Sequence, residues 1–237
     1  MDIMRIAERV ARKGMGIPPK ADPYKHPAFR RYLATVQRRS DRVERALRKI
    51  LEQLPETDKK VVILGPGSSG RRLFWWINEG LKEYNPNNVR LHRIKLITLP
   101  VSARDAVERR GNIARPLTEE RLTEMVLNRG DMRIYRNLVR EIKAGKVMPV
   151  FVDAVKVSGR TERIYREFFK RLGVDFDSVP KIILADRGSE DVCLWDFAAN
   201  LIESPYAFPA AIEKKRTELN EARSTIWFNR YVRRHRR

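Results

Sequence analysis

Residues 148–161 read M-P-V-F-V-D-A-V-K-V-S-G-R-T, and this stretch decides the predicted fold. Its apolar first half predicts a short strand with Asp153 at the carboxyl end, and its Ser/Gly/Thr second half predicts a turn that opens a helix. A strand, a small-residue turn and a helix in this order can place successive backbone N–H groups around an anion. The stretch therefore predicts a phosphate-binding strand–loop–helix unit.

A second unit of this kind precedes it in the chain. The β-branched run K-V-V-I-L (60–64) is followed by G-P-G-S-S-G-R-R (65–72) and then by an apolar helical pattern. Arg71 and Arg72 would add positive charge at the mouth of this loop. It is not a Walker A loop, because no Lys-Ser/Thr pair follows its second glycine, and it lacks the acidic residue that a dinucleotide-binding fingerprint carries about 20 residues further on.

Strand and helix patterns alternate through residues 58–210, which are expected to form the core. Strands are predicted at 60–64, 93–99, 147–152 and 181–185, and helices at about 71–84, 119–144 and 162–172. Such alternation predicts an α/β fold with a parallel sheet and helices on both faces. Because ligands of such sheets bind beyond the carboxyl ends of the strands, the two loops and Asp186 are expected to share one crevice.

Residues 1–57 are expected to form a basic, helical extension of this core. A short basic helix is followed by an irregular Gly/Pro-rich arm up to residue 27. From Phe29 to Leu54 the apolar residues recur at steps of three and four, which predicts one long amphipathic helix or two helices broken near Ser40 and Asp41. This apolar stripe would pack on its own domain or contact a partner, such as the second copy in a homodimer.

The formal net charge of +20 is concentrated at the two ends of the chain. Residues 1–54 hold 14 Lys/Arg against 6 Asp/Glu, and residues 213–237 hold 9 against 3. The terminal segment 211–237 is therefore predicted to be a basic helix with an Arg-rich tail. Basic segments of this kind either bind a polyanion such as RNA, DNA or a nucleoprotein particle, or form an ordinary charged surface that faces water.

The composition excludes several classes of protein. Cys193 is the only cysteine, so no intrachain disulfide can form, and three dispersed histidines offer few ligands to a metal hydrolase. No apolar run approaches the ~20 residues needed to cross a bilayer, and the first residues form no secretory segment. We therefore expect a soluble, cytoplasmic protein that does not insert into a membrane.

Residues 148–161 resemble the phosphoribosyl-pyrophosphate (PRPP) loop of type I phosphoribosyltransferases. The positions that fit the pattern of that loop are Val150, Phe151, Val152, Asp153, Val155, Ser158, Gly159 and Thr161. Two positions depart from it, since Ala154 stands where a second acid is usual and Val157 where a hydroxyl is common. The order of the two loops along the chain also resembles the family, in which the loop after the first core strand receives pyrophosphate.

The resemblance implies a phosphoribosyltransferase-like core and an enzyme that transfers phosphoribose between PRPP, or a nucleoside monophosphate, and a nucleobase-type acceptor. It implies that Asp153 contacts the ribose hydroxyls and that Arg104, in the Arg-rich stretch with Arg109 and Arg110, closes over the reacting sugar. The implied 5′-phosphate site comprises Lys156, Val157, Ser158, Gly159, Arg160 and Thr161. Pyrophosphate would be held by Ser68, Ser69, Gly70 and Arg71, with Mg²⁺ bridging it to the sugar.

The alternative is a binding protein that keeps this fold without catalysis and holds RNA, DNA or a nucleoprotein particle through its basic termini. Ala154 and Val157 favour this alternative. Arginine pairs with phosphates through two parallel hydrogen bonds, and aromatic rings stack on bases. The candidate nucleic-acid-binding residues in the tail are Arg230, Arg233, Arg234, Arg236 and Arg237, with Trp227 and Tyr231 nearby. Trp195, Tyr206 and Phe208 would form either a base-stacking hood over the crevice or part of the core.

Overall fold

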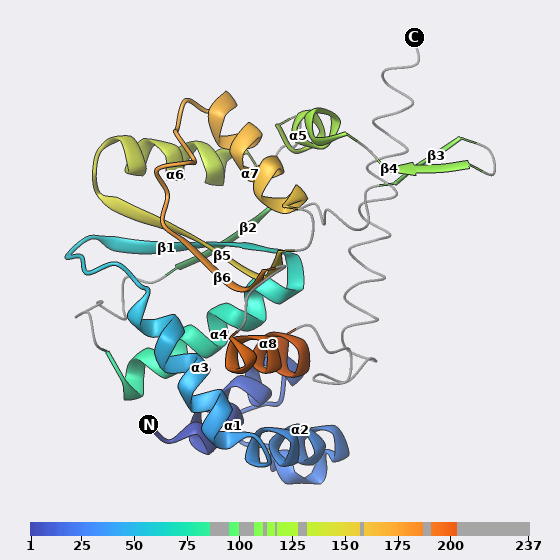
Figure 1. The fold of residues 1–237 in the computed structure, drawn as a ribbon, viewed down its shortest axis with the longest axis vertical. Coiled ribbons are helices and arrows are strands. Elements are labelled where there is room, and N and C mark those ends of the chain that lie inside the picture. Colours follow the sequence, from blue (N-terminus) through green and yellow to red (C-terminus); the bar gives the residue numbers. More distant parts are fainter. Residues whose placement is uncertain are drawn as a thin grey trace.

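A computed structural model describes residues 1–85, 95–99, 107–110, 113–116, 118–127, 132–156, 159–186 and 191–202 of the chain. A four-stranded parallel sheet with the order β2-β1-β5-β6 lies between two layers of helices (Figure 1). Its strands are β1 (Lys60–Pro66), β2 (Lys95–Leu99), β5 (Val147–Lys156) and β6 (Lys181–Asp186). The predicted α/β class with a parallel sheet is confirmed.

The two strands that precede the predicted phosphate loops are neighbours. β1 pairs with β5 from Lys60 opposite Val147 to Leu64 opposite Phe151, and both strands run in the same direction. Their carboxyl ends therefore lie at the same edge of the sheet. This adjacency is the condition that the two loops had to meet in order to serve a single ligand.

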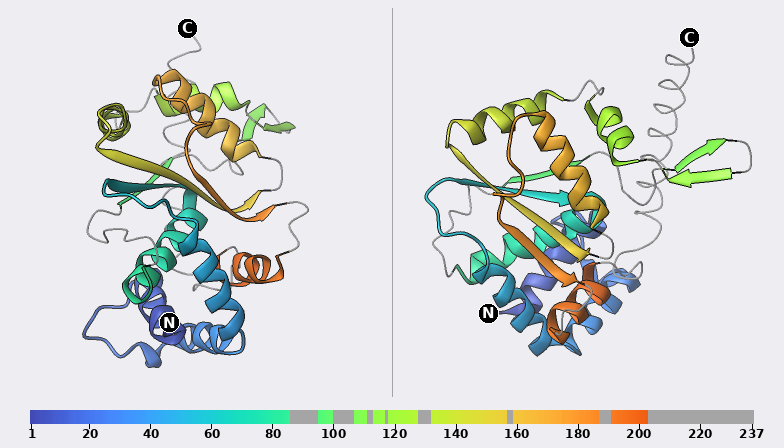
Figure 2. Two further views of the ribbon diagram at one scale, coloured as in Figure 1. Left: turned by 60° about the vertical axis from the view of Figure 1, so that its left-hand side comes forward. Right: turned by 45° about the horizontal axis from the view of Figure 1, so that its top comes forward.

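The helices divide into two layers on opposite faces of the sheet (Figures 1 and 2). The layer below the sheet in Figure 1 comprises α1 (Ile3–Met15), α2 (Pro27–Gln37), α3 (Ser40–Glu52), α4 (Gly67–Glu83) and α8 (Val192–Phe197), with the short helical turns η1 (Pro23–Lys25) and η3 (Ala198–Ile202). The layer above it comprises α5 (Glu119–Leu127), α6 (Arg133–Lys143) and α7 (Arg160–Arg171).

The alternation of side chains along the strands explains both layers, because successive residues of a strand point to opposite faces. In β1, Val61 and Ile63 pack with the lower helices, whereas Val62 and Leu64 pack with the upper ones. All four side chains are nearly inaccessible to solvent. A strand buried on both faces has to be apolar throughout, which is why the run 60–64 could be recognised as a strand.

The N-terminal extension shares its hydrophobic core with the sheet. The predicted stripe from Phe29 to Leu54 is buried against α1, α4 and the lower face of the sheet. α1 is also part of this cluster, with Ile6 and Val10 fully buried. The stripe therefore packs within the chain, and the helix breaks before Ser40, as one of the two alternatives predicted.

Several element boundaries differ from the prediction. β5 was expected to end at Val152, but it runs to Lys156 because β6 pairs with it as far as Asp186. The single helix expected over 119–144 is replaced by α5 and α6, with residues 128–131 outside the described part. The Arg-rich stretch expected as a loop contains the antiparallel hairpin β3 (Val107–Arg110) and β4 (Ile113–Pro116), which projects away from the helical layers in Figure 1.

Among the described residues, no helix combines the length and the apolar character that crossing a membrane would require.

Candidate functional site

The direction of winding reverses between β1 and β5. From β1 the chain passes through α4 to β2 on one side, and from β5 it passes through α7 to β6 on the other side. α4 follows the end of β1 and α7 follows the end of β5, so both helices begin at the carboxyl edge of these neighbouring strands and then cover opposite faces of the sheet (Figure 2). Ligands of open α/β sheets usually bind at such a topological switch point. We name the residues 65–71, 153–156 and 159–161 the switch-point edge.

The junction between β1 and α4 is a direct turn from strand to helix. β1 ends at Pro66 and α4 begins at Gly67, so the predicted Gly/Ser loop is the first turn of a 17-residue helix. The first N–H groups of a helix have no partner within the helix and carry partial positive charge. The change from loop to helix therefore keeps the predicted capacity of Ser68, Ser69 and Gly70 to present backbone donors to an anion.

Two glycines of this junction pack backbone against backbone. A Cβ atom added to Gly70 would lie 2.5 Å from the carbonyl carbon of Gly65, and one added to Gly65 would lie 2.8 Å from the Cα atom of Gly70. No side chain fits in either place. These glycines therefore permit the close approach of α4 to β1, which is a structural need and distinct from contact with a ligand.

The junction between β5 and α7 contains Gly159 immediately before the first helical residue. Its φ of 65° lies in the left-handed region, where a side chain would be strained. No described side chain caps the N-terminus of α7 through a hydrogen bond. Thr161 is partly exposed in the first turn, so its hydroxyl and the adjacent N–H groups can reach an external phosphate.

Asp153 lies inside β5, and the prediction that it ends the strand was wrong. It is opposite Ile183 of β6, and the strand continues to Lys156. Only 8% of Asp153 is accessible, and its side chain has interactions within the fold. The alternation along β5 directs it to the face that α7 covers. The structure thus brings Asp153 to the switch-point edge, but as a largely covered acid.

Ala154 belongs to the hydrophobic core. It is fully buried and packs with the cluster formed by the lower helices and the lower face of the sheet. An acid at this position would have to lose its hydration without a partner, which is strongly unfavourable. The departure from the phosphoribosyltransferase pattern therefore has a structural cause, because β5 continues through this position as a buried strand.

Two residues of α7 that the sequence did not single out connect the parts of the edge. The hydroxyl of Tyr165 donates a hydrogen bond of 2.9 Å to the carbonyl oxygen of Gly65, which ties α7 to the end of β1. The nearly buried carboxylate of Glu162 forms ion pairs with Lys181 at 3.0 Å and with Arg166 at 3.4 Å. Pairing offsets the negative charge of Glu162, which would otherwise oppose an anion at the start of α7.

Arg71 and Arg72 differ in their surroundings, although the sequence suggested the same role for both. Arg71 is exposed on the first turns of α4 and remains a candidate for pyrophosphate binding. Arg72 is only 6% exposed, and it donates a hydrogen bond to the backbone carbonyl of Ile202. Successive helical residues point about 100° apart, so Arg72 stabilises the packing of η3 and adds no charge at the mouth of the site.

Several predicted residues lie outside the described part of the chain. They are Arg104, Val157, Ser158, Tyr206, Phe208 and the tail residues Trp227, Arg230, Tyr231, Arg233, Arg234, Arg236 and Arg237. For Lys156, Arg160 and Asp186 the structure describes the backbone alone. In the described part, no group of three or more His, Cys, Asp or Glu side chains is arranged to hold a metal ion.

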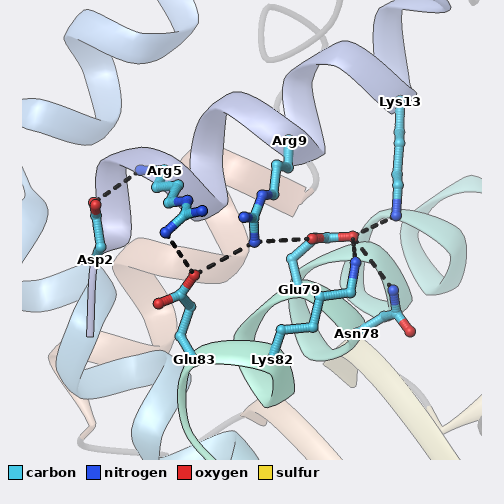
Figure 3. Close-up of polar contacts among 8 residues, drawn as sticks. All are labelled: Asp2, Arg5, Arg9, Lys13, Asn78, Glu79, Lys82 and Glu83. Carbon is cyan, nitrogen blue, oxygen red and sulfur yellow. Dashed lines mark hydrogen bonds and ion pairs between the residues drawn. The ribbon is translucent and has the colours of Figure 1, made fainter. Parts of the chain in front are cut away.

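The basic residues of α1 are paired within the fold (Figure 3). Glu79 of α4, with 1% of its side chain exposed, accepts hydrogen bonds from Lys13 and, at 2.7 Å, from Lys82. Arg9 lies 3.7 Å from the second oxygen of Glu79 and 3.4 Å from Glu83. Burial alone would raise the pKa of Glu79, but the hydrogen bonds from Lys13 and Lys82 outweigh it, and the pKa is lowered. The charges of α1 therefore attach it to α4.

Comparison of the chain with protein-family models, with curated proteins and with solved structures gives no match.

Proposed function

We propose that the chain binds a phosphorylated sugar or nucleotide at the switch-point edge and acts as a phosphoribosyltransferase-like enzyme on PRPP or a nucleoside monophosphate. The observation that carries the proposal is the convergence of two helix N-termini, those of α4 and α7, at the carboxyl edge of neighbouring strands. Two such termini can hold the two phosphate groups at opposite ends of one ligand.

In this proposal the first turn of α7 binds the 5′-phosphate, with the hydroxyl of Thr161 and backbone N–H groups as donors. The first turn of α4 and the side chain of Arg71 bind pyrophosphate. Mg²⁺, carried by the pyrophosphate oxygens, would neutralise charge on the leaving group. Displacement at the anomeric carbon depends mainly on stabilising that leaving group, so fixed donors at two helix termini supply the principal requirement.

The second candidate function is a binding role without turnover. The covered position of Asp153 and the burial of Ala154 favour it, because both remove acids from the reacting sugar. In this case the switch-point edge would hold a nucleotide, while basic surfaces elsewhere hold a polyanion.

Binding of PRPP tests the first proposal directly. With Mg²⁺ present, PRPP should raise the melting temperature in proportion to the logarithm of its concentration above Kd. Thr161→Ala should weaken binding by about 0.5–1.5 kcal/mol through loss of one hydrogen bond, and Asp153→Asn by about 1–3 kcal/mol through loss of a charged partner. Thr35→Ala on α2 is the matched control, since its hydroxyl bonds the carbonyl of Arg31 within that helix.

Calorimetry on the parent and the three variants separates the outcomes. Binding without release of pyrophosphate when nucleobases are supplied would favour the second candidate. If neither PRPP nor a nucleoside monophosphate changes the melting temperature, the switch-point edge is not a nucleotide site and both functions that use it fail.

A further inference from the structure

A hollow lined mainly by arginine lies at the corner between α2 and α3. Its volume is about 500 Å³, and its lining residues are Arg38, Arg39, Ser40, Asp41, Arg42 and Arg45. The corner belongs to the helical layer below the sheet in Figure 1. We name these six residues the arginine hollow. It is separate from the switch-point edge, and no step of the proposed transfer reaction uses it.

Three of the four arginines form no ion pair with an acidic side chain in the described part of the chain. The Nε atom of Arg38 donates to the backbone carbonyl of Ala34 at 3.2 Å, and that of Arg45 donates to the backbone carbonyl of Asp41 at 3.3 Å. Arg42 is exposed and forms no ion pair within the described part of the chain. Bonds to neutral carbonyls restrain a guanidinium without cancelling its charge, so its remaining N–H donors stay available.

The fourth arginine fixes the hollow to the rest of the layer. Arg39 forms an ion pair with Asp196 of α8 at 3.3 Å. Further along α3, Lys49 forms another with Asp191, the residue that caps α8. These contacts hold α3 against α8, so the positions from which the arginines project are set by packed helices.

The start of α3 adds to the positive potential of the hollow. The helix begins at Ser40, and no described side chain caps it through a hydrogen bond. The only acid in the lining is Asp41, which is exposed and accepts a 3.4 Å hydrogen bond from the hydroxyl of Ser40. With Arg39 paired to Asp196, three guanidinium groups and a helix N-terminus remain against the carboxylate of Asp41, which leaves a net positive hollow.

We propose that the arginine hollow binds the phosphodiester backbone of a nucleic acid. All four cations are arginine, whose planar fork matches phosphate oxygens in pairs. Exposed Arg30 and Arg31 continue the basic surface along α2, so it extends beyond what one phosphate ion would occupy. A flexible strand can enter a hollow with successive phosphates, whereas the surface of a lipid bilayer cannot follow a concave wall.

An exposed aromatic ring on the adjoining helix fits the same ligand. Trp195 of α8 is 40% exposed, and it directly precedes the aspartate that pairs with Arg39. Bases stack on exposed aromatic rings without regard to sequence, and phosphates on arginine provide the accompanying charge contacts. An exposed ring on the helix that Arg39 contacts is compatible with a single strand, so single-stranded RNA is the probe for the hollow.

Arg48 provides a matched control on the same helix. Its guanidinium bonds Glu44 at 2.7 Å and lies 4.7 Å from the centre of the Tyr84 ring. Arg48→Ala removes the same formal charge as Arg42→Ala, but it removes a charge that Glu44 already offsets. Asp41→Asn makes the opposite change, because it deletes the one negative charge of the hollow and leaves its shape nearly unchanged.

The experiment measures binding of a labelled single-stranded RNA by the full-length chain at several salt concentrations between about 50 and 200 mM. The double variant Arg42→Ala/Arg45→Ala should bind about 3- to 10-fold more weakly and reduce the salt slope by roughly 0.7 per lost phosphate contact. Arg42→Ala alone should give about half of the change in salt slope, and Arg48→Ala, which removes the same single charge, should leave both quantities unchanged. Asp41→Asn should strengthen binding about 2- to 5-fold, since it removes repulsion of the phosphates.

Other results would overturn the proposal. Full-length protein that does not bind RNA, or a double variant that keeps the parent's affinity and salt slope, would assign any nucleic-acid binding to another part of the chain. Binding to anionic phospholipid vesicles that depends on Arg42 and Arg45, without such dependence for RNA, would make the hollow a membrane contact. Stabilisation by inorganic phosphate that requires Arg42 and Arg45, without RNA binding, would make it a small-anion site.

Discussion

Helix α1 and the α2–α3 corner are both strongly basic, yet their charges have opposite surroundings. Three of the four cations of α1 lie within ion-pair distance of Glu79 or Glu83 of α4, and Arg12 pairs with Glu8 of α1 itself. At the corner, four arginines line a hollow with Asp41 as its only acid. Both regions lie in the N-terminal segment that the sequence marked as excess positive charge.

The difference shows that net charge by itself does not identify a polyanion-binding surface. A cation that already donates to a buried carboxylate has little to gain from an external phosphate, because it would have to leave a partner to reach it. A cation that donates only to a neutral carbonyl can bind a phosphate without breaking an ion pair. The corner can therefore be active in binding while α1 serves the stability of the fold.

The largest expected effect comes from removing the buried acid of the α1–α4 contact. Glu79→Gln should lower the free energy of unfolding by about 1–3 kcal/mol, since Lys13 and Lys82 lose a charged acceptor in a largely buried position. Urea unfolding measures the change. Glu83→Gln is the control, and it should cost less because Glu83 is 21% exposed and its ion-pair distances are longer. If both variants lose the same free energy of unfolding, the burial of Glu79 does not make its ion pairs stronger than those of the partly exposed Glu83.

The ion pairs of Glu79 between α1 and α4 should also make the stability of the fold depend on pH in the acidic range. The pKa of Glu79 is lowered in the folded chain from its ordinary value of 4.5, so the unfolded chain binds the proton first as the pH falls. Stability is therefore fully present above about pH 4.5 and decreases as the pH falls below that value.

Unfolding followed from about pH 7 to about pH 3 tests this dependence. Glu79→Gln should flatten the decrease, although Glu44, Asp177 and Asp191, whose pKa values are also lowered by paired cations, should retain part of it. A pH profile of Glu79→Gln that runs parallel to that of the parent would mean that Glu79 does not contribute.

The smallest expected effect is the difference in folding stability between an arginine variant of α1 and one of the α2–α3 corner. Arg9→Ala should cost up to about 1 kcal/mol of stability, because Arg9 is partly buried and pairs with two acids of α4. Arg42→Ala should change stability by less than about 0.5 kcal/mol, as is usual for an exposed residue that forms no ion pair, which holds for Arg42 within the described part of the chain. Thermal unfolding of the two variants in the same buffer compares them. A loss for Arg42→Ala as large as that for Arg9→Ala would mean that the hollow has a structural role.

Much of the architecture was predictable because its signals are local. The run 60–64, the repeats of three and four residues from Phe29 to Leu54, and the Gly159 turn each specify an element from neighbouring residues alone. The alternation of strands and helices predicted one parallel sheet, whereas the expectation that β1 and β5 are neighbours came from the hypothesis that their two loops share one ligand. These elements place the switch-point edge where the sequence expected a shared phosphate site.

The misplaced residues depend on partners that are distant in the sequence. β5 passes beyond Val152 because β6 pairs with it, and the lower helical layer then buries Ala154. Arg72 turns away from the edge because the carbonyl of Ile202, 130 residues later, accepts its hydrogen bond. Helical spacing places Arg72 on the face of the buried Trp76, but only the tertiary structure supplies the carbonyl that accepts its hydrogen bond.

The sequence by itself determined the α/β class, the four strands of the parallel sheet and the two glycine-bearing junctions, because hydrophobic period and turn residues act over a few positions. The tertiary structure alone decided which charged side chains form ion pairs within the fold and which remain available to an external ligand. Lys13 pairs with Glu79 across 66 residues of chain, whereas Arg38, Arg42 and Arg45 form no ion pair with a described acid. Electrostatic pairing depends on distance in space, and only the packing of α1, α3 and α4 sets those distances.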